Sequence, residues 1–82
     1  MAAKSVRILY YALLREERGM GAETLETEAE TTGALYAELR MRHNFRLPQS
    51  SMQVAVDDQF AGWEAPLKDG AKVVFIPPVA GG

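Results

Sequence analysis

The chain has 82 residues, a formal net charge of −2 and no cysteine; 48% of its residues are hydrophobic and 24% are charged. This length suits a single domain, expected over residues 1–82, whose small core leaves no room for a deep active site of its own. The composition excludes disulfides, thiolate metal sites and cysteine nucleophiles, and the interspersed charges exclude the basic stripe that nucleic acid requires.

The sequence also lacks the signals of a membrane or exported protein. No apolar run approaches the roughly 20 residues that a membrane-spanning helix needs. The first residues, from Met1 to Ser5, have no apolar core of the signal-peptide kind. We therefore expect a cytoplasmic protein that binds neither a membrane nor nucleic acid.

The first strand is predicted over residues 5–13, where β-branched and aromatic residues dominate. Side chains alternate between the two faces of a strand. One face carries Val6, Ile8, Tyr10 and Ala12, and the other carries Arg7, Leu9, Tyr11 and Leu13. Residues 14–18 predict a short helical turn, which Gly19 ends. Residues 23–29 alternate again and predict a second strand with one solvent-facing side.

The main helix is predicted to begin after Thr31 or Thr32, since a hydroxyl side chain accepts hydrogen bonds from the free N–H groups of a first turn. It is expected to run to about His43. Its apolar stripe consists of Leu35, Tyr36 and Leu39. Phe45 and Leu47 follow in a loop and are expected to cover the edge of the core.

The second half of the chain predicts three strands. In chain order the elements are a strand at 52–57, a turn at Asp57-Asp58, a returning strand at 59–61, a turn at 67–70 and a last strand at 71–76. The turn at 67–70 ends in Asp-Gly, residue types that tolerate positive φ. Pro77 and Pro78 end the last strand, because proline cannot donate to a sheet ladder.

The predicted order is therefore β-β-α-β-β-β, an α+β arrangement in which one main helix packs across a mixed sheet. The first and last strands are both long and apolar, so we expect them to form the central parallel pair. This is the β-grasp, or ubiquitin-like, fold. No internal repeat or linker divides the chain.

The tail at 77–82 is the first candidate site. The prolines favour an extended exit, and side chains shrink toward Gly81 and Gly82, so that the tail can enter a narrow channel. At about 3.3 Å per residue it reaches roughly 20 Å. Its reactive group is the terminal carboxylate, which adenylation would turn into an acyl donor for sulfide or an amine. The other interpretation is a frayed chain end without a role.

The second candidate site is an apolar patch on the face of the sheet that the helix cannot cover. Leu9 and Tyr11 lie on this face of the first strand, and Ile76 lies on it at the end of the last strand. The register after the turn decides whether Phe60 joins them. Exposed apolar patches usually mark partner surfaces, although a loop such as 44–51 could fold over this one.

The remaining polar residues predict no chemistry of their own. His43 is the only histidine and is expected to have a structural role at its helix end. The acidic pairs Glu16-Glu17 and Asp57-Asp58 are expected to be solvated. The sequence has no P-loop, no dinucleotide-binding glycine pattern and no metal-ligand spacing, so we expect no bound cofactor or metal.

The segment Phe75-Ile-Pro-Pro-Val-Ala-Gly-Gly82 resembles the C-terminal signature of the small subunit of molybdopterin synthase. Val6-Arg-Ile-Leu-Tyr-Tyr-Ala12, followed by Arg15-Glu16, resembles the opening strand of that family, and Leu67-Lys-Asp-Gly70 also fits its pattern. The resemblance covers essentially the whole chain and is most specific in the tail.

This resemblance implies a sulfur carrier with the β-grasp fold. An ATP-dependent adenylating enzyme similar to ubiquitin-activating enzymes would adenylate Gly82, and a sulfurtransferase system would convert it to a thiocarboxylate. The tail would then enter the large subunit of the synthase and donate sulfur to a pyranopterin precursor of the molybdenum cofactor. The chain itself would be a non-catalytic subunit that binds no cofactor, and ATP would be used by the activating partner.

The resemblance also assigns roles by position. Gly82 would bear the sulfur, and Gly81, which has no side chain, would let the end of the tail enter a narrow channel. The apolar contacts with the large subunit would come from Tyr11, Phe60 and Ile76, and polar contacts from Arg15 and Lys68. The family assembles as a heterotetramer, with two small subunits at the ends of a large-subunit dimer.

Two other classes of function stay open. One keeps the tail chemistry but changes its destination, as in a carrier for thiamin biosynthesis or a protein modifier that forms isopeptide bonds. Thiamin-pathway carriers are usually shorter and lack the Pro-Pro-Val tail, which counts against that destination. The other class is a β-grasp interaction module whose two terminal glycines are incidental.

Overall fold

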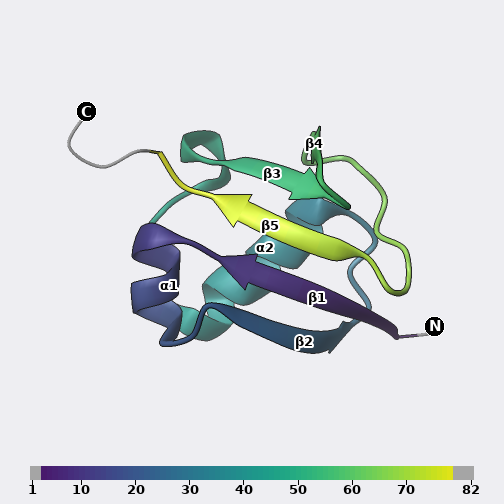
Figure 1. Cartoon of the computed structure of the whole chain (residues 1–82), viewed down its shortest axis with the longest axis horizontal. Helices are drawn as coiled ribbons and strands as arrows, with labels where there is room; N and C mark the ends of the chain where they lie inside the picture. Colours follow the sequence, from purple (N-terminus) through teal and green to yellow (C-terminus); the bar gives the residue numbers. More distant parts are fainter. Residues whose placement is uncertain (1–2, 79–82) are drawn as a thin grey trace.

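A computed structural model of the chain describes residues 3–78 and shows one sheet with a long helix packed against it (Figure 1). The predicted site residues Gly81 and Gly82 lie outside the described residues. The elements in chain order are β1 (Lys4–Tyr10), α1 (Ala12–Arg18), β2 (Ala22–Thr27), α2 (Thr32–His43), the 3-10 helix η1 (Gln49–Ser51), β3 (Gln53–Val56), β4 (Gln59–Ala61) and β5 (Lys72–Ile76).

The sheet has the strand order β2-β1-β5-β3-β4, and β1 and β5 form a parallel pair at its centre. The other three neighbouring pairs, β1 with β2, β3 with β5 and β3 with β4, are antiparallel. The predicted α+β β-grasp architecture and its central parallel pair are therefore confirmed. Because β5 runs parallel to β1, its C-terminal end lies beside the start of α1.

The first strand is shorter than predicted, and a helix follows it directly. β1 ends at Tyr10, and α1 begins at Ala12 with its first residue at φ 52°. The helix turns the completely buried side chain of Leu14 into the core, which stabilises this change of direction. The prediction that Leu13 extends the outer face of the strand is therefore wrong, whereas Gly19 (φ 83°) ends the helix as predicted.

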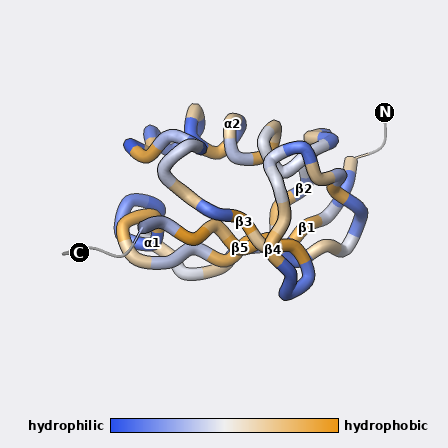
Figure 2. The backbone as a smooth tube through the Cα atoms, turned by 90° about the horizontal axis from the view of Figure 1, so that it is seen from above, coloured by the Kyte–Doolittle hydropathy of each residue, from blue (hydrophilic) through white to orange (hydrophobic). Residues whose placement is uncertain are grey.

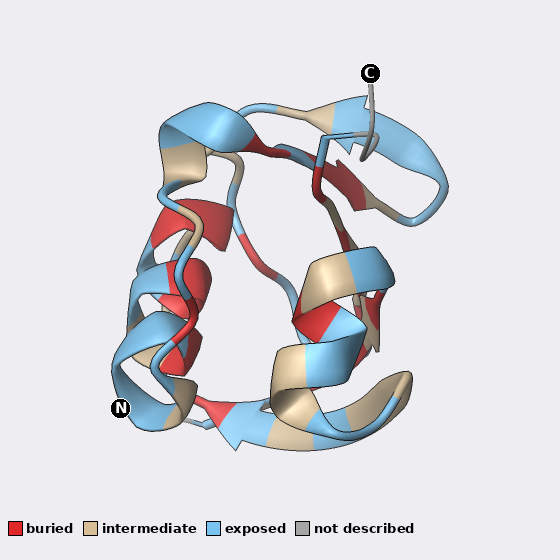
Figure 3. Cartoon of the chain, turned by 90° about the vertical axis from the view of Figure 1, so that its left-hand side faces the viewer, coloured by how far each residue is buried: buried red, intermediate tan, exposed pale blue. Residues whose placement is uncertain are grey.

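The core lies between the sheet and α2, which form two layers (Figure 2). Buried positions on the two layers face each other (Figure 3). It includes the predicted inward residues of the first and last strands and the helical stripe: Val6, Ile8, Tyr10, Val73, Phe75, Leu35, Tyr36 and Leu39. At the N-terminus of α2, the Thr31 hydroxyl accepts a 3.1 Å hydrogen bond from the Ala34 N–H, which confirms one of the two predicted caps.

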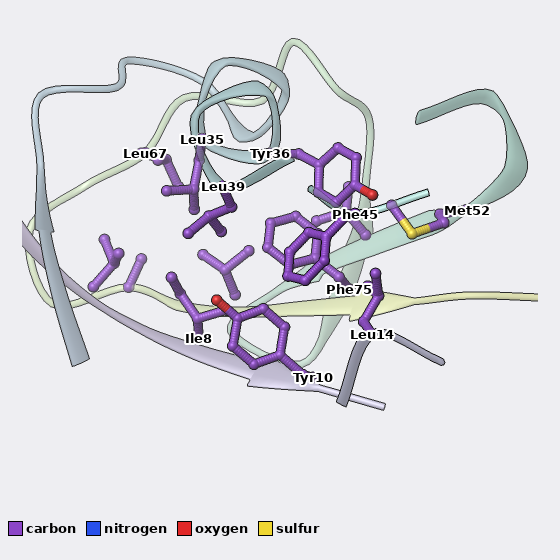
Figure 4. Packing of buried hydrophobic residues seen from close by; sticks show 14 residues of the cluster. Ile8, Tyr10, Leu14, Leu35, Tyr36, Leu39, Phe45, Met52, Leu67 and Phe75 are labelled. Atoms are coloured by element: carbon purple, nitrogen blue, oxygen red, sulfur yellow. The ribbon is translucent and has the colours of Figure 1, made fainter. Parts of the chain in front are cut away.

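The loop after α2 is part of the core itself, whereas we expected it only to cover the edge of the core. Phe45 is only 3% exposed, and its ring lies 6.0 Å from Tyr36 in a stacked pair and 5.8 Å from Tyr10 in an edge-to-face pair (Figure 4). Such aromatic pairs stabilise a core beyond their buried area. Leu47 is partly buried against the same cluster. Neither helix of residues 3–78 has the length and apolar character needed to cross a membrane.

Candidate docking face beside the C-terminal tail

The face of the sheet away from α2 carries an apolar row that crosses all five strands, whose order can be followed in Figure 1. Leu9 on β1 lies opposite Val74 on β5, Val74 lies opposite Ala55 on β3, and Ala55 lies opposite Phe60 on β4. Ala22 on β2 extends the row beyond Leu9. We call these five residues the outer row.

Phe60 is the most prominent member of the outer row. Its side chain is 74% exposed, whereas Leu9 and Val74 are half-buried and Ala55 is only 9% exposed. The register of the β3–β4 hairpin therefore does bring Phe60 onto the predicted patch. An exposed aromatic side chain beside a flat apolar row is the arrangement of an anchor residue in a protein interface.

A second pair of apolar residues lies on the same face, nearer the tail. Tyr10 and Phe75 are register partners that point into the core, so the residues that follow them, Tyr11 and Ile76, point to the outer side. Tyr11 is 49% exposed and Ile76 is half-buried. The apolar face thus continues from the outer row to the place where the chain leaves the sheet.

Charged groups bound the opposite side of the outer row. The Lys72 Nζ lies 2.6 Å from the Asp58 carboxylate, and this hydrogen bond raises the pKa of the lysine. The Lys72 backbone N–H also donates to the Asp57 carboxylate over 3.0 Å. Asp57 and Asp58 have φ values of 51° and 73°, which confirms the predicted turn between β3 and β4. Arg7 lies opposite Lys72, so the face changes from charged to apolar toward the tail.

The structure separates the two predicted polar contact residues. Arg15 is exposed on α1, one helical turn after Tyr11, whose carbonyl accepts a 3.4 Å hydrogen bond from the Arg15 N–H. Lys68 is exposed in the turn before β5 and lines a hollow that Phe60 also lines. The two cations therefore lie beside different apolar residues of the face, and their roles in binding stay predictions.

The exit of the tail is bordered by a shallow cleft of about 390 Å³. One wall is formed by Ile76, Pro77 and Pro78, and the other by Ser50, Ser51, Met52 and Gln53. The described part of the predicted tail, Pro77 and Pro78, therefore lines this cleft. Among residues 3–78, no group of three histidine or carboxylate side chains could hold a metal ion.

A polar network that joins β1, the last residue of α1 and β2 was missed by reasoning from the sequence. The Tyr10 hydroxyl donates a 2.6 Å hydrogen bond to Glu23, and Arg18 donates to both oxygens of the same carboxylate over 3.0 and 2.8 Å. Burial, followed by the bond to Glu23, raises the pKa of Tyr10. The hydrogen bonds from Arg18 lower the pKa of Glu23. The network fixes α1 to β2 and makes the tyrosine a structural group.

Known proteins resemble this chain along almost its whole length. The molybdopterin synthase sulfur carrier subunit of Escherichia coli (strain K12) is 29% identical over 80 residues, which cover 94% of this chain and 99% of the relative. Small archaeal modifier protein 1 from Methanosarcina acetivorans has a similar structure, with a TM-score of 0.78, 20% identity and all of both chains covered.

A third similar structure is the complex of subunits 1 and 2 of molybdopterin-converting factor from Helicobacter pylori 26695. One of its chains aligns with a TM-score of 0.63 and 24% identity, covering 95% of this chain and 99% of that one. A family model described as the ThiS family matches residues 8–82. The match begins within β1, includes all of β5 and extends through the tail, and the chain therefore belongs to the ThiS family.

Proposed function

We propose that this chain is the sulfur-carrier subunit of a molybdopterin synthase. The observation that carries the proposal is the end-to-end similarity to the Escherichia coli subunit of that name, together with a family match that extends to residue 82. The continuous apolar face that leads to the tail supplies the surface on which such a carrier would dock.

The chemistry belongs to the carboxyl group of Gly82. A carboxylate at neutral pH is a poor electrophile. Attack of one carboxylate oxygen on the α-phosphorus of ATP forms an acyl adenylate and releases pyrophosphate. A sulfide equivalent then attacks the carbonyl carbon, AMP leaves, and a thiocarboxylate remains. No side chain of this protein takes part, so the chain acts as a non-catalytic subunit that binds no cofactor and relies on its adenylating partner for ATP.

The apolar face of the sheet away from α2 provides the docking energy. The side chain of Phe60 and the exposed part of Tyr11 offer apolar surface that a partner removes from water, worth about 25 cal/mol per Å² before the costs of association. The large subunit of the synthase would cover this face while the tail enters its active site, where sulfur passes to the pyranopterin precursor. We place this reaction in the cytoplasm, in a heterotetramer with two carriers.

A reconstitution with the large subunit and the pyranopterin precursor tests this proposal. The thiocarboxylated protein should support molybdopterin formation, and a variant lacking Gly82 should not. If the truncated variant supports formation equally well, the carrier function is wrong. If the intact protein instead becomes linked to lysine side chains when ATP and an activating enzyme are present, the protein-modifier alternative replaces it.

A further inference from the structure

The alternation of β5 between the two faces of the sheet continues past the end of the strand. Val73 and Phe75 are completely buried, and Pro77 is also buried, although the strand ends at Ile76. Pro78 is exposed. The two prolines that begin the tail are therefore in different environments: the first belongs to the core side of the sheet, and the second faces solvent.

Sheet hydrogen bonds do not account for the position of Pro77. The last register pair between β3 and β5 joins Gln53 and Ile76, and a proline has no N–H to extend the ladder. The N–H of Met52, the residue before Gln53, donates instead to the Gln49 carbonyl over 3.0 Å and caps the end of η1. Pro77 and Met52, which is 7% exposed, are both buried and line the same cleft, so burial of the proline ring is the interaction left to fix the chain here.

We propose that Pro77 is a positioning residue that anchors the tail, whereas Pro78 only stiffens it. This inference rests on the sulfur-carrier function proposed above. Five residues follow Pro77 in the sequence, and at about 3.3 Å each they set a maximum reach of roughly 17 Å between the anchor and the reactive carboxyl group. A fixed anchor defines where that reach begins, so the partner's active site meets the carboxyl group in a narrow range of positions.

The energetic reason is orientation. Holding a reacting group in place can replace much of the entropy cost of bringing reactants together, and a displacement of about 1 Å can cost as much as about 100-fold in rate. Without the anchor, the last fixed residue becomes Ile76, and the chain direction at its exit is free. The loss would appear in the rate of transfer inside the complex, because the outer face that docks the protein is unchanged.

The anchor can be measured in the free protein without any substitution. Carbon-13 relaxation at the Cα atoms should give Pro77 an order parameter near the roughly 0.85 of rigid backbone, as at Phe75, and Pro78 a lower value. Equal values at the two prolines, both below that of Phe75, would overturn the proposal. This measurement does not depend on the sulfur-carrier function, so its failure is distinct from a failure of that function.

Pro77→Ala and Pro78→Ala form a matched pair, because each removes one proline ring at adjacent positions. With thiocarboxylated protein and saturating large subunit, we expect Pro77→Ala to slow single-turnover sulfur transfer by about 10-fold while the Kd for the large subunit stays within about 2-fold. Pro78→Ala should slow transfer by less than about 3-fold. Pro77→Val restores an apolar side chain at the buried position and should recover part of the rate.

A merely structural role would lower the Tm of Pro77→Ala and leave transfer at saturation unchanged below that temperature. That outcome, or an equal slowing by Pro78→Ala, would overturn the proposal. If Pro77→Ala does not fold, the relaxation measurement on the unmodified protein still decides. If the unmodified protein transfers no sulfur at all, the proposed function is wrong, and the anchor is judged by relaxation alone.

Discussion

Leu9 on β1 lies directly opposite Val74 on β5, in the parallel register at the centre of the sheet. This pair joins the first and last strands on the face that α2 leaves open, and it is the centre of the outer row. Because β5 leads into Pro77 and Pro78, the same register brings the apolar face and the exit of the chain to one end of the central strands. In the proposed carrier, docking and delivery of the tail are thus linked by one strand.

Phe60 should be an anchor of the interface. Because its side chain is 74% exposed, Phe60→Ala should change the free energy of unfolding by no more than about 0.5 kcal/mol. Truncation of an aromatic anchor typically costs about 2 kcal/mol of binding, or about 30-fold in Kd for the large subunit. The measurement is a binding titration with the large subunit.

Met41→Ala is the matched control for Phe60→Ala. Met41 is 83% exposed but lies on α2, on the other side of the sheet. The Met41→Ala variant should bind the large subunit as tightly as the unmodified protein does. Weaker binding by Met41→Ala with no effect of Phe60→Ala would move the interface to the helical side.

Ile76 and its neighbour Phe75 should respond in opposite ways to the same change. Ile76→Asp introduces a charge on the outer face, so it should weaken binding to the large subunit while the free protein stays folded. Phe75→Asp introduces the charge into the core at a position with 0% exposure, so it should unfold the free protein. Circular dichroism with thermal unfolding checks both variants, and unfolding of free Ile76→Asp would show that its side chain belongs to the core.

The carboxylate of Glu23 should make stability depend on acid pH. Hydrogen bonds from Arg18 lower its pKa below the ordinary value. At acid pH the unfolded chain therefore binds a proton at Glu23 more readily than the folded chain does. The stabilisation is therefore present above the unfolded pKa of about 4.3 and is lost as the pH falls through the lower, folded pKa. Glu23→Gln should be less stable near neutral pH, and the difference should shrink toward pH of about 3.

Urea unfolding of both proteins between neutral and acid pH measures this difference. A difference that stays constant across that range would contradict the assignment, because it would show that the charge of Glu23 contributes nothing. Tyr10→Phe is a comparison variant, because it removes one of the hydrogen bonds that lower the pKa of Glu23 but leaves those from Arg18, the larger cause, in place. It should therefore keep most of the pH dependence.

The outer face could be predicted because it depends on alternation within single strands. Leu9 follows from the two-residue period of β1, and Ile76 follows from that of β5. Tyr11 follows because the backbone stays extended for one residue after β1. Joining these strands needed the expectation of a central parallel pair, which their apolar composition supports. The place of Phe60 in the row could not be predicted, because it depends on the register that the Asp57-Asp58 turn imposes on the hairpin.

Other features depend on contacts between distant residues and have no local signal. The chain leaves β1 at Tyr10 because burial of Leu14 outweighs the β-propensity of residues 11–13. The bonds that join Tyr10 and Arg18 to Glu23 form only when β1, α1 and β2 are assembled. The burial of Pro77 likewise depends on the path of η1, which the sequence does not indicate beyond the break at Pro48.

The most direct test of the sulfur-carrier function is the intact mass of the protein after incubation with the activating enzyme, ATP and a sulfur source. We expect a mass increase equal to the replacement of one oxygen by one sulfur, located by fragmentation at Gly82, and no change when ATP is omitted. An unchanged mass under conditions in which a known carrier is converted, or sulfur located at any residue other than Gly82, would contradict it.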